Sequence, residues 1–215
     1  MTILTVYILY SMQKVNNPSS LTHRQRQALE TRRLIVEAAR ALFLDRGYAA
    51  TPIEAIALQA GVSVSTVYAV FGSKRGILRA IREAWHRETH IRDVTYSTTP
   101  DVDPATRLDR LAHATRQQWE TGADVISIYQ GAAAADRDAA SELVEALRGR
   151  RTGFETLAAS LRQGLRPGLA VDQASSVLRA LCLPEVHAEL VGQSGWSEDA
   201  YEAWLAAAVK RELLP

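Results

Sequence analysis

The sequence has very little cysteine, and its apolar N-terminal run stops after ten residues. Cys182 is the only cysteine, which excludes an intrachain disulfide and a site of several thiolate ligands. It lies in an apolar stretch, so we expect a buried, unreactive thiol. Residues 1–10 are too short to cross a bilayer and lack the flanks of a signal peptide. The cytosol is therefore the expected compartment.

Motifs of catalysis are also lacking. The sequence contains no nucleophile elbow, no glycine-rich phosphate loop and no HExxH zinc motif. Glu83, His86 and His90 are spaced to share one helix face, but no fourth ligand accompanies them, so we expect a solvated face and no metal. We expect neither an enzyme nor a cofactor.

The net charge of +1 hides an uneven distribution. Residues 21–91 contain 11 Lys and Arg against 6 Asp and Glu, whereas residues 92–215 contain 13 against 18. A basic N-terminal part followed by an acidic remainder is typical of a phosphate-binding domain joined to one that does not bind phosphate.

No segment alternates as a strand would, and every periodic segment has the helical period, so we predict an all-α fold. We interpret residues 1–20 as a disordered arm, and whether residues 1–12 belong to the native protein stays open. Residues 21–91 and 92–215 would be the two domains, divided by the proline- and Ser/Thr-rich stretch 93–104. The expected helices are 22–46, 52–60, 64–71, 74–91, 104–122, 123–135, 136–165, 172–191 with a break near Pro184, and 197–214. Ser73 and Ser197 would cap the helices that follow them. Leu147 would face inward in the helix 136–165, and the first helix would have an apolar stripe with Leu34 at its edge, formed by Ile35, Ala38, Ala39, Leu42 and Phe43.

Residues 47–78 contain two short helices joined by a tight turn. Thr51 and Glu54 are spaced as a capping box, with Pro52 where a missing N–H costs nothing. Gly61 supplies a left-handed turn, and Ser63 caps the second helix, in which Val67 and Phe71 would be buried. This pattern is a helix-turn-helix, whose second helix lies in a DNA major groove.

The same stretch resembles the N-terminal domain of the TetR family of transcriptional regulators. The matching positions are Gly47-Tyr48, Thr51, Ile56-Ala57, Ala60-Gly61-Val62-Ser63, Thr66, Tyr68, Phe71 and Ser73-Lys74. Two positions depart from the family pattern. Ala69-Val70 replaces a larger or more polar pair, and Gly76 replaces a better helix former, which should loosen the following helix by up to ~1 kcal/mol. Residues 169–214 also resemble the C-terminal end of one TetR subgroup.

The resemblance implies how the chain would contact DNA. Val64, Ser65 and Tyr68 would project toward the groove and Thr66 toward the backbone. Thr51, Ser63 and Lys74 lie at helix N-termini, where amides and the helix dipole favour phosphate. Capping alone also accounts for Thr51 and Ser63, and core packing is the alternative for Tyr68.

The resemblance further implies a homodimeric, ligand-responsive regulator, expected to be a repressor that binds a near-palindromic double-stranded operator. A small-molecule effector would bind the C-terminal domain, where the candidate pocket residues are His113, Trp119, Tyr129 and Phe154. Packing in the core is the alternative for each. The candidate dimer interface consists of Ala174, Val177, Leu178, Leu181, Tyr201, Leu205 and Ala208.

A second function stays open from the sequence. An all-helical ligand-binding or scaffold protein could keep a helix-turn-helix without reading DNA specifically. Ala69-Val70 favours this alternative, because these two positions offer no polar group to a base edge.

Overall fold

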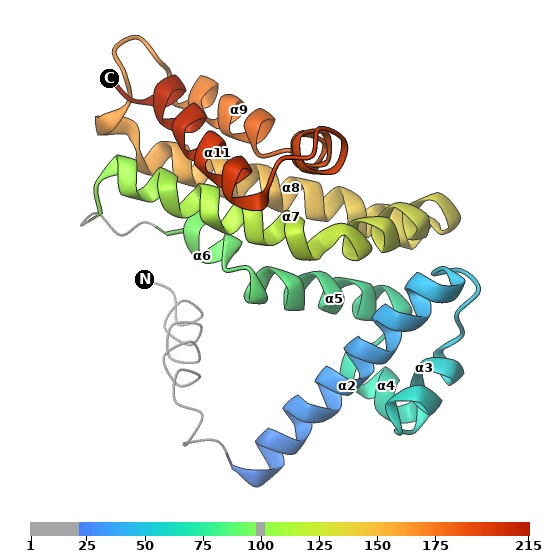
Figure 1. Cartoon of the computed structure of the whole chain (residues 1–215). Helices are drawn as coiled ribbons and strands as arrows, with labels where there is room; N and C mark the ends of the chain where they lie inside the picture. The colour runs from blue at the N-terminus through green and yellow to red at the C-terminus, as the bar shows by residue number, and fades with distance from the viewer. Residues whose placement is uncertain (1–21, 98–101) are drawn as a thin grey trace.

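The protein consists of helices in the parts that the computed structural model describes, residues 22–97 and 102–215 (Figure 1). The arm expected over residues 1–20 lies outside these ranges. No single described helix is long and apolar enough to span a membrane; the pair Ile53–Ala60 and Val64–Phe71 meets the requirements of length and composition only when taken together, across a bend of 103°. The described elements are α2 (His23–Arg46), α3 (Ile53–Ala60), α4 (Val64–Phe71), α5 (Lys74–Glu88), α6 (Ile91–Thr95), α7 (Pro104–Ala135), α8 (Arg137–Ser160), η2 (Arg162–Gly164), α9 (Val171–Leu181), α10 (Pro184–His187), η3 (Ala188–Gln193) and α11 (Glu198–Leu213).

Helix α2 forms as its sequence predicts. Thr22 caps it in a capping box with Gln25, and Gly47, at φ 82°, ends it. The predicted apolar stripe is buried and packs on α3 and α5, while Leu34 is partly exposed at its edge. The buried residues of this stripe are Ile35, Ala38, Ala39, Leu42 and Phe43.

The start of α3 differs from the prediction. Pro52 is the N-cap residue and makes no side-chain cap, so the capping box of Thr51 and Glu54 is absent. Thr51 is fully buried instead, and its hydroxyl donates to the carbonyls of Gly47 at 2.8 Å and Leu42 at 3.2 Å. These two bonds hold the connection between α2 and α3 against the end of α2. Spacing alone could not distinguish this tertiary role from a cap.

The turn into α5 explains why position 76 carries glycine. Ser73 caps α5 as predicted, by accepting from the Gly76 amide at 3.2 Å. A Cβ at position 76 would overlap the carbonyl of Phe71, the last residue of α4. Gly76 is therefore required by the close approach of two helices, and its low helix propensity is secondary.

Helix α7 is longer than predicted. The sequence led us to end a helix at Gly122, but α7 continues through it to Ala135. Gly122 is buried, and a Cβ there would overlap the indole of Trp85 on α5. A glycine inside a helix can thus provide room for a neighbouring side chain, and the sequence pattern of the two cases is the same.

Later elements also depart from their predicted bounds. Helix α8 ends at Ser160 and is followed by η2, not by helix up to Leu165. Leu147, predicted to face inward, is largely exposed. The last section contains α9, the short α10 and a π-helical turn η3 before α11, which Ser197 caps as predicted.

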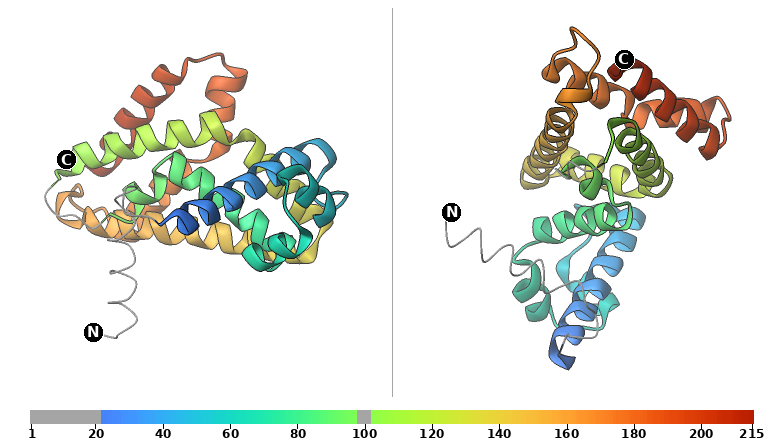
Figure 2. Two further views of the ribbon diagram at one scale, coloured as in Figure 1. Left: turned by 90° about the horizontal axis from the view of Figure 1, so that it is seen from below. Right: turned by 90° about the vertical axis from the view of Figure 1, so that its left-hand side faces the viewer.

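The body of the molecule, helices α7 to α11, packs two long helices against a C-terminal pair. Helices α7 and α8 lie side by side, and α11 packs on both α7 and α9 (Figures 1 and 2). The predicted dimer interface is largely wrong, because most of its residues are buried where α9 and α11 pack on each other and on the two long helices of the same chain. Those fully buried within the single chain are Ala174, Leu178, Tyr201, Leu205 and Ala208, while Val177 and Leu181 stay partly exposed.

The head, helices α2 to α5, is joined to the body by ion pairs and one buried tryptophan. Arg40 on α2 binds Asp124 on α7 through two hydrogen bonds of 2.5 and 2.8 Å. Glu142 of α8 is buried and binds Arg79 at 2.7 Å and Arg82 at 3.1 Å, both on α5. Since both partners of each contact come from different helices, the contacts fix how the head sits on the body.

We expect Gly122→Ala to destabilise the protein by about 1–3 kcal/mol, because the added methyl group would overlap the Trp85 indole. Gly131→Ala on the same helix is the matched control. It has open space around its Cβ and should be neutral or stabilising by up to about 1 kcal/mol. Urea denaturation followed by circular dichroism measures both, and equal stabilities would contradict this role of Gly122.

Candidate DNA interface and ligand cavity

The N-terminus of α4 presents a cluster of hydroxyl groups. The Ser63 Oγ accepts from the Thr66 amide at 3.1 Å and lies 2.8 Å from the hydroxyls of both Ser65 and Thr66. Ser63 and Ser65 are exposed, and Val64 and Thr66 are half-buried beside them. The structure therefore brings these four predicted residues together at one helix end, where free amides favour an anion.

Tyr68 is the large aromatic group on the outer face of α4. It is 50% exposed, whereas Val67, next to it, is 1% exposed. The core-packing alternative for Tyr68 is therefore wrong. Phe71 is only half-buried, beneath the guanidinium of Arg32, whose carbon lies 4.7 Å from the ring centroid.

Lys74 lies at the N-terminus of α5 but is not extended into solvent. Its Nζ lies 4.4 Å from the centroid of the Tyr48 ring and donates to the Ala49 carbonyl at 3.3 Å. Partial burial lowers the pKa of its ammonium. Arg75, which we did not single out from the sequence, is exposed beside it and forms no ion pair within the described residues.

Thr51 is predicted to contact DNA, but its side chain is buried and cannot do so. Its side chain has no exposed surface and both of its hydrogen bonds are intrachain. The other predicted contacts are exposed or half-buried residues of α4, of its N-cap and of the start of α5, namely Ser63, Val64, Ser65, Thr66, Tyr68 and Lys74.

A cavity of ≈ 350 Å³ lies between the head and the body. Residues from α5, α6, α7, α8 and the segment around α10 line it. Three of the four predicted pocket residues, Trp119, Tyr129 and Phe154, are in its wall. The size and the mainly apolar lining are typical of a site for a small organic molecule.

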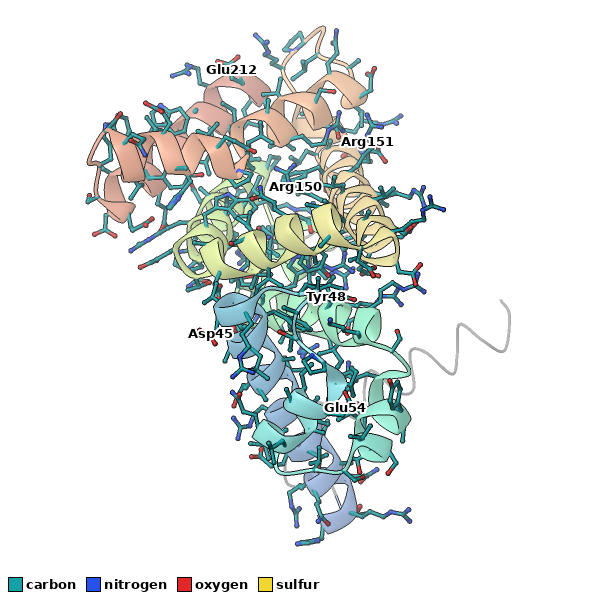
Figure 3. All side chains as sticks on the ribbon, turned by 90° about the vertical axis from the view of Figure 1, so that its right-hand side faces the viewer. Asp45, Tyr48, Glu54, Arg150, Arg151 and Glu212 are labelled. Atoms are coloured by element: carbon teal, nitrogen blue, oxygen red, sulfur yellow. The ribbon has the colours of Figure 1, made fainter. Side chains whose placement is uncertain are left out.

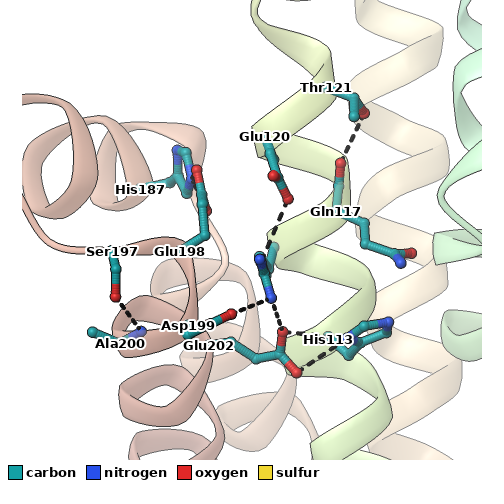
Figure 4. Close-up of polar contacts among 11 residues, drawn as sticks. His113, Gln117, Glu120, Thr121, His187, Ser197, Glu198, Asp199, Ala200 and Glu202 are labelled. Atoms are coloured by element: carbon teal, nitrogen blue, oxygen red, sulfur yellow. Dashed lines mark hydrogen bonds and ion pairs between the residues drawn. The ribbon is translucent and has the colours of Figure 1, made fainter.

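His113 does not line this cavity. It is on the outer side of α7, where its Nδ1 lies 3.1 Å from the carboxylate of Glu202 on α11 (Figure 4). Arg116 binds the same carboxylate at 3.2 Å and Asp199 at 2.7 Å. His113 thus belongs to a polar contact that joins α7 to α11, and the prediction that it lines the pocket is wrong.

His86 is a cavity residue that the sequence analysis placed on a solvated face. It lies mostly buried in the wall, and its Nδ1 has no hydrogen-bond partner in the described structure. Burial, together with the charges of Arg82 and Arg92, lowers its pKa from 6.5 to about 4. Glu83 and His90 pair elsewhere, with Arg32 and Asp93, and no group of metal-ligating side chains occurs in the described parts of the chain.

Comparison with known proteins agrees with the geometry of α2 to α5. The family described as bacterial regulatory proteins, tetR family, matches residues 35–81. HTH-type transcriptional regulator TtgR of Pseudomonas putida is 38% identical over 86 residues, which are 40% of each chain. Residues 35–81 therefore form a DNA-binding helix-turn-helix domain of the TetR family.

Solved structures of other proteins share the fold of this chain over most of its length. One of these proteins is SmeT, the repressor of the Stenotrophomonas maltophilia multidrug efflux pump SmeDEF. The structure of the SmeT–triclosan complex is 22% identical in sequence and has a TM-score of 0.69, over 86% of this chain and 92% of SmeT. NalD, secondary repressor of the Pseudomonas aeruginosa pump MexAB-OprM, is 22% identical, with a TM-score of 0.65 over 88% and 98%. The chain matches only 40% of the length of TtgR, so the two sequences are similar over less than half of each protein.

We expect His86 to make the protein less stable as the pH falls from about 6.5 to about 4. The unfolded chain takes up a proton on His86 below about 6.5, whereas the folded protein keeps the imidazole neutral until about 4. The loss of free energy of unfolding is on the order of 2–3 kcal/mol. His86→Gln should reduce this loss in urea titrations at pH 7 and 4.5, and His113→Gln controls for removing an exposed imidazole. An unchanged loss in His86→Gln would contradict the burial of the neutral ring.

Proposed function

We propose that the protein is a homodimeric, ligand-responsive repressor that binds a near-palindromic operator through α4 and the start of α5. The hydroxyl cluster at the α4 N-terminus and the exposed Tyr68 support this proposal most directly. Residues 21–91 would act as the DNA-binding domain and residues 92–215 as the ligand-binding and dimerisation domain.

Helix α4 is the proposed recognition helix. Ser65 and Tyr68 would offer hydroxyl groups to base edges, and Val64 could contact a thymine methyl group. Ala69 is exposed and Val70 half-buried, so these two positions contribute only apolar contacts. Ser63, Thr66 and Lys74 would bind phosphates, with Arg75 as an additional cation.

The proposed dimer uses the outer faces of α9 and α11. One side of each helix is buried against the rest of the body, and the other side carries small or apolar residues that are exposed or only half-buried in the single chain. Small side chains allow two copies of a helix pair to approach closely. The exposed or half-buried residues of this face are Val177, Ala180, Leu181, Ala203, Trp204 and Ala207.

The cavity offers a route from ligand to DNA. Arg82, Trp85 and His86 are part of its wall and also part of α5, which carries Lys74 and Arg75 at its other end. A ligand that prefers one position of α5 would change the spacing of the two heads on the operator. Its effect is limited to its difference in affinity for the two states. One solved structure of SmeT, which shares this fold, is of its complex with triclosan.

Binding to DNA from the protein's own upstream intergenic region tests the function. By fluorescence anisotropy, Lys74→Ala should weaken binding to all sequences alike and reduce the salt slope by about one unit. Tyr68→Phe should cost about 0.5–1.5 kcal/mol on the preferred sequence only. Arg211→Ala, on α11, is the control and should change neither. Equal affinity of the wild type for unrelated DNA would favour the alternative of a helical ligand-binding protein that does not read DNA specifically.

Ala203→Arg should disrupt the proposed dimer. The new cation would lie in the apolar interface, and a buried unpaired charge costs several kcal/mol. Since Ala203 is exposed in the single chain, helix content should be retained, which would not hold for the buried Leu205. Sedimentation velocity should show a monomer with weakened operator binding, and an intact dimer would place the interface elsewhere.

A further inference from the structure

The wall of the cavity contains a mostly buried cation, Arg150. It belongs to the inward stripe of α8, one helical turn before Phe154, and its guanidinium carbon lies 5.1 Å from the centroid of the Phe154 ring. Burial lowers the pKa of Arg150, as expected for a cation removed from water. Figure 3 labels Arg150 among the helices of the body and its neighbour Arg151 at the outer edge of α8.

Arg150 has no carboxylate partner among the described residues. Its Nη2 donates to the Cys182 carbonyl at 2.8 Å and the Arg179 carbonyl at 3.3 Å, and its other N–H groups form no hydrogen bond there. Arg82, another cation of the wall, does pair with a carboxylate, that of Glu142. A cation that is largely buried without a counter-charge is costly, so its position in a cavity needs an explanation.

Several other polar atoms of the wall have no hydrogen-bond partner in the described structure. Trp119 is 8% exposed, and its unpartnered Nε1 can only donate, whereas the unpartnered Nδ1 of His86 donates or accepts according to the tautomer. Trp85 and Tyr129 already donate, to the carbonyls of Gln118 at 3.1 Å and Leu78 at 3.1 Å, so they offer only their rings.

The acidic residues of the wall do not balance Arg150. Glu145 is more than half exposed and pairs with Arg148. Glu185 is exposed and forms no ion pair with Arg150 within the described residues, and its charge offsets the effect of burial on the pKa of Arg150 only in part. Within the described structure, the cavity therefore combines a mainly apolar wall with a cation, Arg150, that has no carboxylate partner.

We propose that the effector is an amphipathic organic acid, with an aromatic or aliphatic body and one carboxylate or acidic phenol, and that Arg150 binds its anionic group. This proposal rests on the ligand-responsive function above and names the class of its ligand. The planar guanidinium suits a carboxylate, since it can donate two parallel hydrogen bonds. The rings of Trp119, Tyr129 and Phe154 would contact the apolar body.

A purely structural role for Arg150 makes a different prediction. Its bonds to Arg179 and Cys182 place a cation at the C-terminus of α9, where the helix dipole favours it. If this were its whole role, replacing Arg150 would lower stability but would leave the choice of ligand unchanged.

Isothermal titration of the full-length protein without DNA separates the two roles. The probes are biphenyl-4-carboxylate and the nearly isosteric, neutral biphenyl-4-carboxamide. We expect the wild type to bind the carboxylate about 10- to 100-fold more tightly, the difference that a charge-assisted hydrogen bond provides. Arg150→Gln should reduce this ratio to less than about threefold while the carboxamide affinity is retained.

Arg151→Gln is the matched control. Arg151 is the next residue along α8, its side chain is exposed and pairs with Glu155, and the substitution removes the same charge. It should keep the wild-type ratio. Arg150→Lys, which keeps the charge and a donor for the α9 carbonyls, should keep part of it and serves if Arg150→Gln does not fold.

Two results would overturn the proposal. One is a wild type that does not prefer the carboxylate, whether because both probes bind equally or because neither binds. The other is an unchanged preference in Arg150→Gln with normal helix content. Neither result bears on the DNA-binding function, which the anisotropy experiment tests without ligand.

Discussion

The arrangement of head and body depends on the packing of the Trp85 side chain against Gly122. The indole is 5% exposed, donates to the Gln118 carbonyl and packs against Trp119 with centroids 5.8 Å apart. It occupies space on α7 that only a glycine leaves free. Because the same indole also lines the cavity, one side chain connects the DNA-binding helices, the long helix of the body and the proposed effector site.

Ion pairs around this contact limit the positions that α5 can take. Glu142 is almost fully buried and holds Arg79 and Arg82 together, while Arg40 and Asp124 link α2 to α7. Breaking a buried pair leaves an uncompensated charge, so intermediate positions of α5 would be costly. A small set of alternative positions, separated by such costs, is what a ligand can select between.

The sequence predicted what depends on local spacing and missed what depends on tertiary contact. The stripe of α2 and the caps Ser63 and Ser73 follow from neighbours within one helix, and the structure has them as expected. Thr51, Gly122 and Leu205 could not be assigned in this way, because each takes its role from another helix. Helix α11 is apolar on more than one side, so periodicity could not tell its core face from the face proposed for the dimer.

Arg150 shows that a local signal was nevertheless present. A cation at the helical spacing of the inward side, one turn before Phe154, is readable from the sequence alone, although only the fold shows that a cavity lies beside it. Allosteric coupling commonly amounts to about 1–3 kcal/mol, which is comparable to one charge-assisted hydrogen bond. If the anionic group binds Arg150 on α8 while the body of the ligand presses on Trp85 and His86 of α5, one bond of this strength is enough to bias the position of the head. The apolar body then determines which state is favoured, and the charge determines which molecules can exert the effect.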